Sequence, residues 1–281
     1  MARPVNAGST ELNMQENPPV LRREVMGGLA KGLEVLRAFS RDKPHMTLSE
    51  IAARAGLPPA TARRCLNTFE ELGYVMRSGR QFLLRPKVLE IGAAYLESMD
   101  IEALTHTHLE EMARETGDSA ALSVLDGTEI VYVARASIRT LLRLEAHVGS
   151  RFPAHATSMG RVLLSGLRAE RLHWYLSNAA IKPLTEKTET DPDRLSHQIS
   201  DARRSGYSIV EDELAYGVIA IAVPVFDSTG RIVAALNSSS HSRRTTRATL
   251  LDERLPMLQR ISGEISSQIA RVPGISLSAQ F

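Results

Sequence analysis

The chain has 281 residues, 43% of them apolar, and a formal net charge of +2, so it can bury a core in one or two domains. No apolar leader is visible, and no stretch approaches the roughly 18 apolar residues of a bilayer span, which excludes a membrane-spanning protein and favours a cytoplasmic one. The single cysteine, Cys65, excludes an intramolecular disulfide and suits a reducing compartment.

Charge is distributed unevenly along the chain. Residues 1–24 are polar, lack periodicity, carry 3 Lys+Arg against 3 Asp+Glu, and are expected to form a disordered tail. Residues 25–86 carry 10 against 5, whereas residues 87–281 carry 21 against 24. A small basic module joined to a larger, slightly acidic one favours a polyanion partner for the first module. A surplus of this size also occurs on ordinary solvated faces.

The basic module contains three short helical patterns. Apolar residues at helical spacing predict the first helix over roughly 27–41. The stretch TLSEIAARAG (47–56) begins with a capping box, in which Thr47 and Glu50 satisfy each other's backbone amides. The stretch LPPATARRCLNTFEELG (57–73) starts with prolines in its first turn and ends at a glycine. The short connection between the last two helices predicts a helix-turn-helix.

The third helix has two different faces. At about 100° per residue, its apolar residues form one stripe, and Arg63, Arg64 and Asn67 lie opposite it near the helix start. Its acidic pair comes only in the last turn. Arg pairs bidentately with guanine and Asn with adenine, so this face is a candidate reader of the DNA major groove. The alternative is an ordinary solvated helix face.

A predicted hairpin favours the DNA-binding interpretation. The stretch YVMRSGRQFLL (74–84) alternates apolar and polar residues around the turn dipeptide Ser78-Gly79, with Arg77 and Arg80 on either side of it. Such a hairpin after a recognition helix is the wing of a winged helix-turn-helix, and its arginines would contact phosphate or the minor groove. The predicted DNA-contacting residues are Thr47, Pro59, Ala60, Thr61, Arg63, Arg64, Asn67, Arg77 and Arg80.

A linker follows the wing, which ends at Pro86. Residues 87–101 predict a helix that places Val88, Ile91 and Tyr95 on one stripe. This helix is long enough to pair with a second copy of itself. Covering its own domain is the alternative.

The larger module, 102–281, alternates strands and helices. Two hairpins are predicted, at 119–136 around Asp126-Gly127 and at 217–239 around the turn DSTG. Antiparallel strands with helices on their faces predict an α+β sensor-like domain. The other predicted elements are a strand at 141–149 and helices at 102–117, 157–167, 168–176, 191–205 and 246–272.

Catalytic and metal-binding signatures are absent from the sequence. It contains no G-x-S-x-G, G-x-G-x-x-G, Walker A or H-E-x-x-H motif. Cys65 falls on the apolar stripe of its helix, and His106 and His108 would point to different faces of another. The pair Glu211–Asp212 is read as a loop or pocket rim rather than an acid/base pair. We therefore expect no catalytic residue, no metal site and no cofactor.

Small polar residues beside apolar strands indicate a ligand pocket instead. HATSMG (155–160) places hydroxyls and backbone amides at a helix start, where an anion is favoured, and ALNSSS (235–240) ends an apolar strand with polar side chains. Together they predict a pocket for a small carboxylate. Helix caps and turn residues are the alternative for each stretch taken singly.

The order of these parts resembles the IclR family of bacterial transcriptional regulators over about residues 25–272. The resemblance is carried by GLAKGLEVLRAF, TLSEIAARAGLPPATARRCLNTFEELGYV, PAHATSMGRVLLS and YGVIAIAVPVFDSTGRIVAALNSSS. It implies a winged helix-turn-helix, a linker helix and a GAF-like effector domain, assembled as a homodimer or dimer of dimers. Its implied partners are double-stranded operator DNA, a small carboxylate effector and, as a further candidate, RNA polymerase.

Within the family, TSMGRVLLSGL and YVARAS look most like the branch that regulates aromatic-acid catabolism through the β-ketoadipate pathway. Family effector contacts match positions in the HATSMG loop and on the two strands of the second hairpin. Other members often carry a polar residue or cysteine at Ala220 and serine at Asn237, which suggests a less polar, roomier pocket here. The rival hypothesis is a GAF-like metabolite-binding protein or enzyme whose basic module serves assembly. The predicted effector-binding residues are His155, Thr157, Ser158, Met159, Gly160, Ala220, Asn237 and Ser239.

Overall fold

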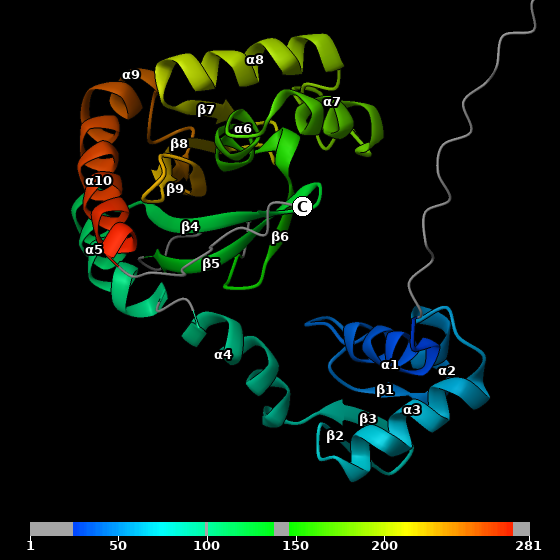
Figure 1. The fold of residues 1–281 in the computed structure, drawn as a ribbon. Coiled ribbons are helices and arrows are strands. Elements are labelled where there is room, and N and C mark those ends of the chain that lie inside the picture. The colour runs from blue at the N-terminus through cyan, green and yellow to red at the C-terminus, as the bar shows by residue number, and fades with distance from the viewer. Residues whose placement is uncertain (1–24, 99–100, 138–145, 272–281) are drawn as a thin grey trace, which may run out of the picture. The chain divides into compact units, whose positions relative to one another are not determined.

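The computed structural model describes residues 25–98, 101–137 and 146–271 (Figure 1). The predicted disordered tail, 1–24, lies outside the described residues. The chain divides into two compact units, Met1–Glu90 and Ile91–Phe281, and the division falls within helix α4 (Leu89–Ser98).

The smaller unit is a winged helix-turn-helix, as the sequence predicts. Its three-stranded antiparallel sheet has the order β1-β3-β2. The first helix ends earlier than expected, because residues 38–45 form turns around the bridge between Ser40 and Lys43. The elements are α1 (Gly27–Arg37), β1 (Met46–Thr47), α2 (Leu48–Arg54), α3 (Pro59–Glu71), β2 (Val75–Ser78) and β3 (Gln81–Leu84), followed by a 3-10 turn, η1 (Pro86–Val88).

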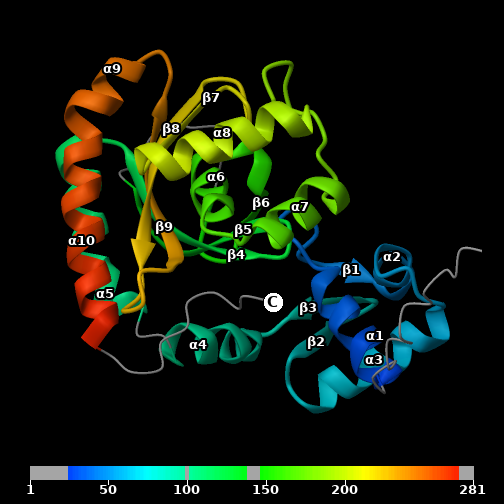
Figure 2. The ribbon, with the colours of Figure 1, turned by 45° about the horizontal axis from the view of Figure 1, so that its top comes forward.

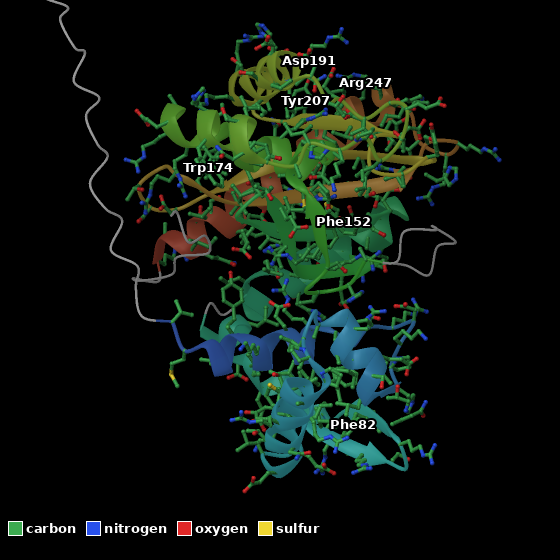
Figure 3. All side chains as sticks on the ribbon, turned by 90° about the vertical axis from the view of Figure 1, so that its right-hand side faces the viewer. Phe82, Phe152, Trp174, Asp191, Tyr207 and Arg247 are labelled. Carbon is green, nitrogen blue, oxygen red and sulfur yellow. The ribbon has the colours of Figure 1, made fainter. Side chains whose placement is uncertain are left out.

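One small core holds this unit together. Val35 of α1, Ile51 of α2 and Leu66 of α3 are fully buried against each other, and Phe82 of β3 joins them from the wing (Figure 3). The helix-turn-helix is therefore fixed by side chains from all three helices and the hairpin, and the opposite face of α3 is left to solvent.

The larger unit is built on a six-stranded antiparallel sheet of order β6-β5-β4-β9-β8-β7. This confirms the predicted α+β class. Its strands are β4 (Ser119–Asp126), β5 (Glu129–Ser137), β6 (Arg151–Pro153), β7 (Ser208–Glu211), β8 (Val218–Phe226) and β9 (Ile232–His241). Its helices are α5 (Ile101–Thr116), η2 (Ala154–Ala156), α6 (Ser158–Ser165), α7 (Ala169–Asn178), α8 (Pro192–Ser205), α9 (Arg247–Thr249), η3 (Leu250–Arg254, a π turn) and α10 (Leu255–Arg271).

Helices cover both faces of this sheet, and each face has its own core. Helices α5 and α10 cover one face, where Leu122 and Ile221 pack with Ile265; α6 and α8 cover the other, where Ala121 and Ala235 are buried (Figures 1 and 2). Because neighbouring strand residues point to opposite faces, Asn237 and Ala235 share the α6 face. The small residues on that face leave room between the sheet and the start of α6.

The strand predicted at 141–149 is wrong where it can be compared. Residues 138–145 lie outside the described part, and residues 146–149 form a turn in which Gly149 adopts φ +88° and donates its amide to the Tyr132 carbonyl. The strand that pairs with the outer edge of β5 lies later in the chain and is β6. No helix in the described ranges combines the length and apolarity that a bilayer span requires.

Candidate DNA-binding surface and effector cavity

The outer face of α3 offers unpaired polar side chains. Ala62 and Leu66 bury the inner face, whereas Arg63, Arg64 and Asn67 are exposed. These three form no side-chain hydrogen bond or ion pair with any other described residue. Cys65 is half-buried against the core, as expected for a packing residue. The exposed face is therefore free to make hydrogen bonds to a partner.

The predicted residues at the start of α3 occupy its first turn. Pro59 is the first helical residue, which suits its missing amide hydrogen, and both Pro59 and Ala60 are exposed while Thr61 is half-buried. Thr47 already serves the structure as the cap of α2, because its hydroxyl donates to Glu50 Oε2 at 2.9 Å and accepts from the Glu50 amide at 3.4 Å. One lone pair of that hydroxyl remains for DNA.

The two wing arginines are placed differently. Arg77 Nε donates to the Gly79 carbonyl at 3.0 Å, and its guanidinium lies 5.8 Å from the centre of the Phe82 ring. Arg77 therefore folds back on the hairpin instead of projecting from the tip. Arg80 is exposed and forms no contact of these kinds with the described residues. Of the pair, Arg80 is the better placed to reach a phosphate.

A small, half-open cavity of about 30 Å³ lies between the sheet of the larger unit and the start of α6. Such a volume holds about one water molecule. Whether the pocket is roomier than in other family members stays a prediction. The cavity is lined by the predicted residues Thr157, Ser158, Met159, Ala220, Asn237 and Ser239, and by Tyr132, Ala156, Val210, Leu214 and Val218, which the sequence patterns did not single out.

Two of the predicted residues do not line the cavity. The His155 ring turns away, with Nε2 3.1 Å from the Lys182 carbonyl oxygen, and burial lowers the pKa of His155, which favours the neutral ring that donates there. Gly160 lies at a close backbone approach, since a Cβ there would overlap the Ala154 carbonyl oxygen. Thr157 caps the helix by accepting from the Gly160 amide at 3.0 Å. Both His155 and Gly160 shape the start of α6 without facing the cavity.

The sheet side of the cavity carries a buried polar pair. Asn237 is 3% exposed, and its Oδ1 has no hydrogen-bond partner among the described residues. Burial raises the pKa of Tyr132 to about 12, against opposing effects of the Arg135 charge and a hydrogen bond from Asn237. Tyr132 is therefore protonated at neutral pH.

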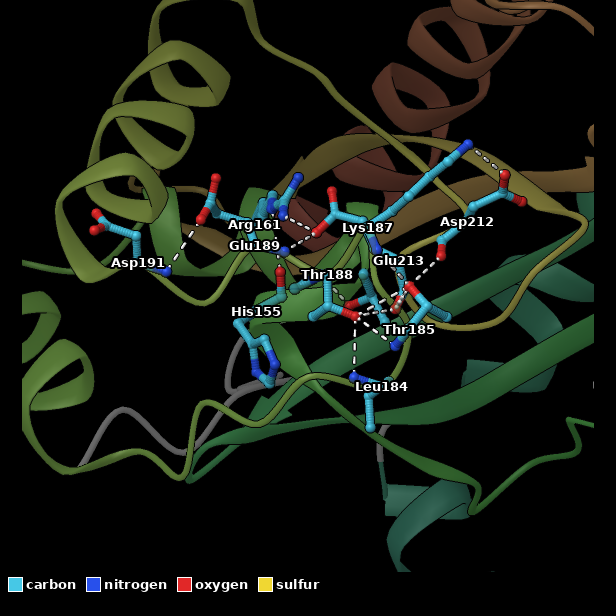
Figure 4. Close-up of polar contacts among 12 residues, drawn as sticks. His155, Arg161, Leu184, Thr185, Lys187, Thr188, Glu189, Asp191, Asp212 and Glu213 are labelled. Carbon is cyan, nitrogen blue, oxygen red and sulfur yellow. Dashed lines mark hydrogen bonds and ion pairs between the residues drawn. The ribbon is translucent and has the colours of Figure 1, made fainter.

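A loop after β7 brings Leu214 over the cavity. Its anchor is a buried ion pair: Arg161 Nη2 lies 2.6 Å from Glu213 Oε2, which also accepts the Glu189 amide at 2.9 Å (Figure 4). The same guanidinium donates from Nε to the His155 carbonyl at 3.1 Å. Arg161 belongs to α6, so one side chain joins the helix that lines the cavity to the loop that covers it.

Asp212, read from the sequence as part of a rim, fixes the turn of this loop. It has a left-handed backbone with φ 59°, and its carboxylate accepts the Gly217 amide at 2.6 Å and pairs with Lys187 Nζ at 2.8 Å. The Lys187 hydrogen bond lowers the pKa of Asp212 in spite of its partial burial, and the Gly217 amide adds to the effect. The carboxylate is thus committed to structure.

The described residues contain no group of three or more His, Cys, Asp or Glu that could hold a metal ion. His106 lies 3.4 Å from Glu110, and His108 lies 3.4 Å from Glu264 on α10. The two histidines therefore point to different partners.

A basic winged helix-turn-helix in the same chain as an α+β domain with a small, partly polar cavity defines a class: ligand-responsive DNA-binding regulators. The model of the IclR helix-turn-helix domain matches residues 28–79, and the model of the bacterial transcriptional regulator IclR C-terminal domain matches residues 93–267. The chain belongs to the IclR family of bacterial transcriptional regulators.

Named relatives place this chain beside regulators of aromatic-acid genes. It is 38% identical over 247 residues to the Pca regulon regulatory protein of Pseudomonas putida, which covers 88% of this chain and 85% of the relative. It is 35% identical over 251 residues to the p-hydroxybenzoate hydroxylase transcriptional activator of Acinetobacter baylyi. That match covers 88% of this chain and 93% of the relative. Among solved structures, the chain is similar to the crystal structure of an IclR homolog complexed with 4-hydroxybenzoate from Microbacterium hydrocarbonoxydans. The two superpose with a TM-score of 0.76 at 26% sequence identity, and the match covers 86% of this chain and 98% of the homolog.

Proposed function

We propose that this chain regulates transcription by binding operator DNA through α3 and the wing, in response to a small aromatic carboxylic acid such as 4-hydroxybenzoate. The observation that carries the proposal is the small cavity, with Ser158 and Met159 of a helix start on one side and Asn237 on the other. The names of two relatives and the ligand of the homologous structure support the class of acid. These relatives are regulators by name, and we propose no catalytic role.

The cavity is amphipathic in a way that suits such an acid. Val210, Leu214 and Val218 supply apolar wall, which favours a ring. The first turn of α6 has the positive end of a helix dipole and backbone amides, which stabilise a carboxylate without a buried counter-charge. Because the cavity holds only about 30 Å³, we expect the acid to widen it by moving the loop that carries Leu214, which is partly exposed.

We further propose that the regulator acts as a homodimer or a dimer of dimers. Helix α4 supports this proposal, because Leu89 is 73% exposed and Ile91 is 54% exposed. An apolar strip on a linker helix is suited to pairing with its own copy, which would present two recognition helices to one operator. Contact with RNA polymerase remains a prediction.

The test is binding of the full chain to the DNA upstream of its own gene, at several salt concentrations, with and without 4-hydroxybenzoate. A regulator should bind with an affinity in the nanomolar range, a steep salt dependence and a symmetric footprint. The acid should shift that affinity. A scrambled duplex of the same composition is the control. Equal micromolar binding to both duplexes would favour the rival hypothesis, in which the basic module serves only assembly.

A further inference from the structure

We propose that a polar cleft between α8 and the outer edge of β7 binds a small zwitterion, such as an amino acid, as a second ligand of this chain. The cleft has a volume of about 540 Å³, which lies in the range of small-molecule sites, and it shares no lining residue with the cavity at the start of α6. The inference goes beyond the proposed function, because it adds a ligand of different charge at a different place.

Four of the charged side chains that line the cleft are paired with one another. Arg161 Nη2 lies 2.6 Å from Glu213 Oε2, and Arg204 Nη2 lies 2.7 Å from Asp201 Oδ1 (Figure 4 shows the first pair). The side chains of the first pair are only 4% and 11% exposed, so this pair forms a fixed wall. Because each pair is neutral, neither one favours a ligand of one sign over the other.

The two remaining charged lining residues, Glu211 and Arg247, have opposite signs. Both are exposed, and neither forms an ion pair or a side-chain hydrogen bond with another described residue. The charge of Lys187 acts on Glu211, but its ammonium is paired with Asp212 Oδ2 at 2.8 Å. A ligand with one ammonium and one carboxylate satisfies both Glu211 and Arg247, whereas a simple acid or a simple amine satisfies only one of them.

The outer edge of β7 adds backbone donors and acceptors. β7 is the last strand of the sheet, and the Asp212 amide after it donates to the Val218 carbonyl at 2.8 Å. Because hydrogen-bonded positions alternate along an antiparallel strand, the peptide groups of Ile209 and Glu211 face away from β8. Both residues line the cleft. Their amides are suited to a carboxylate and their carbonyls to an ammonium.

Gln198 of α8 supplies a further acceptor. Its Oε1 is buried and has no hydrogen-bond partner among the described residues, and the residue lines the cleft. A turn of the amide toward the cleft therefore gives up no hydrogen bond of this oxygen and allows it to accept from a ligand. The ammonium of the ligand is then met by Glu211 and Gln198, and its carboxylate by Arg247 and the outward amides of β7.

Isothermal titration of the full chain with glycine, β-alanine and 4-aminobutyrate at pH 7 tests the inference. These three differ in the distance between ammonium and carboxylate. At least one of them should bind once per chain with a Kd of about 1 mM or below. Butylamine, which lacks the carboxylate, should bind at least about fivefold more weakly than the best of the three, because it leaves Arg247 without a partner.

Substitutions of the two unpaired charges locate the site. Glu211→Gln and Arg247→Gln should each weaken binding of the best amino acid by about fivefold, as for an exposed charge pair, and should leave 4-hydroxybenzoate binding unchanged. Both side chains are exposed, so the substitutions preserve the core. Glu115→Gln and Arg243→Gln are the matched controls, because these exposed charges line neither the cleft nor the cavity. They should leave amino-acid binding unchanged.

The outcomes separate this inference from the proposed function. The inference alone is overturned if no amino acid binds, if butylamine binds as tightly as the best amino acid, or if Glu211→Gln and Arg247→Gln both retain the wild-type affinity. Failure of 4-hydroxybenzoate to bind the wild-type chain would overturn the proposed function and leave the amino-acid result standing.

Discussion

Position 160 requires glycine, because the backbone of Ala154 leaves no room for a Cβ atom there. A Cβ at this position would overlap the Ala154 carbonyl oxygen, and both residues are buried. Gly160→Ala must therefore push α6 away from η2, which should lower the free energy of unfolding by about 3 kcal/mol, as for overpacking of a rigid site. Urea unfolding of the full chain, followed by circular dichroism, measures the change.

Gly263 provides the matched control. It lies exposed inside α10, and a Cβ there would meet nothing within 4 Å. Gly263→Ala should raise the free energy of unfolding by up to about 1 kcal/mol, through helix propensity alone. A similar decrease in the free energy of unfolding in both variants would show that the close approach of Gly160 to Ala154 does not cause the destabilisation.

The residues of the cavity were only partly predictable from the sequence. Thr157, Ser158 and Asn237 were predicted because a helix start and a strand end have local signatures, whereas Met159 and Ala220 were predicted only from the family resemblance. His155 belongs to the same short motif, but it precedes the cap, and its ring is directed to Lys182 across a long loop. Tyr132 was missed because, in an alternating apolar strand, a tyrosine reads as packing. Tyr132 of β5 lines the same cavity as Asn237 of β9 only because of the order of the strands in the sheet.

At the scale of elements, α3 and the wing should have different effects on DNA binding. Arg64→Ala and Asn67→Ala should each reduce discrimination between operator variants by about 1–3 kcal/mol, because their exposed side chains can reach base edges. Arg80→Ala should weaken binding to all sequences alike and lower the salt slope by about 1, as for one lost phosphate contact. Fluorescence anisotropy across salt concentrations and operator variants separates the two effects.

Arg77→Ala is the control for the wing. Because Arg77 is held by the Gly79 carbonyl and the Phe82 ring, its removal should change the salt slope less than the removal of Arg80. If Arg64, Asn67 and Arg80 variants all behave alike, α3 is not the element that reads sequence.

The buried ion pair between α6 and the loop over the cavity gives another prediction. Arg161→Met leaves the buried Glu213 carboxylate with a single donor among the described residues, the Glu189 amide, and should lower the free energy of unfolding by about 3–5 kcal/mol. Adding Glu213→Leu removes the isolated charge, so the double variant should be more stable than Arg161→Met alone. Thermal and urea unfolding of both variants decide the matter; a double variant less stable than the single one would contradict it.

Elements with local signals were predicted, and those that depend on distant partners were not. The capping box at Thr47 and the turn at Asp126-Gly127 each lie within a few residues, and the corresponding elements are confirmed. β1 is two residues long and exists only because Met46 and Thr47 pair with β3. The Arg161–Glu213 pair joins residues 52 positions apart in the chain, which no periodicity reveals.

At the scale of the whole molecule, charge separates DNA binding from effector binding. The basic surplus falls in residues 25–86, where the exposed face of α3 lies, and the acidic surplus falls in the part that holds the cavity. An effector in the cavity acts on DNA only through its differential affinity for two states of the protein. Assembly through α4 would allow such a difference to alter the spacing of two recognition helices.

This coupling must be reciprocal, and that can be measured. If 4-hydroxybenzoate changes the operator Kd by some factor, saturating operator must change the acid Kd by the same factor, with about 5-fold to 150-fold as the usual range. Anisotropy titrations of labelled operator with and without saturating acid give the first factor. Calorimetric titration of acid into free and operator-bound protein, at the same protein concentration and salt, gives the second. Asn237→Leu should bind operator normally without acid and respond only at higher hydroxybenzoate concentrations, because its defect lies in the cavity. If neither the operator Kd nor the acid Kd changes, the chain binds both partners without any coupling between the two sites.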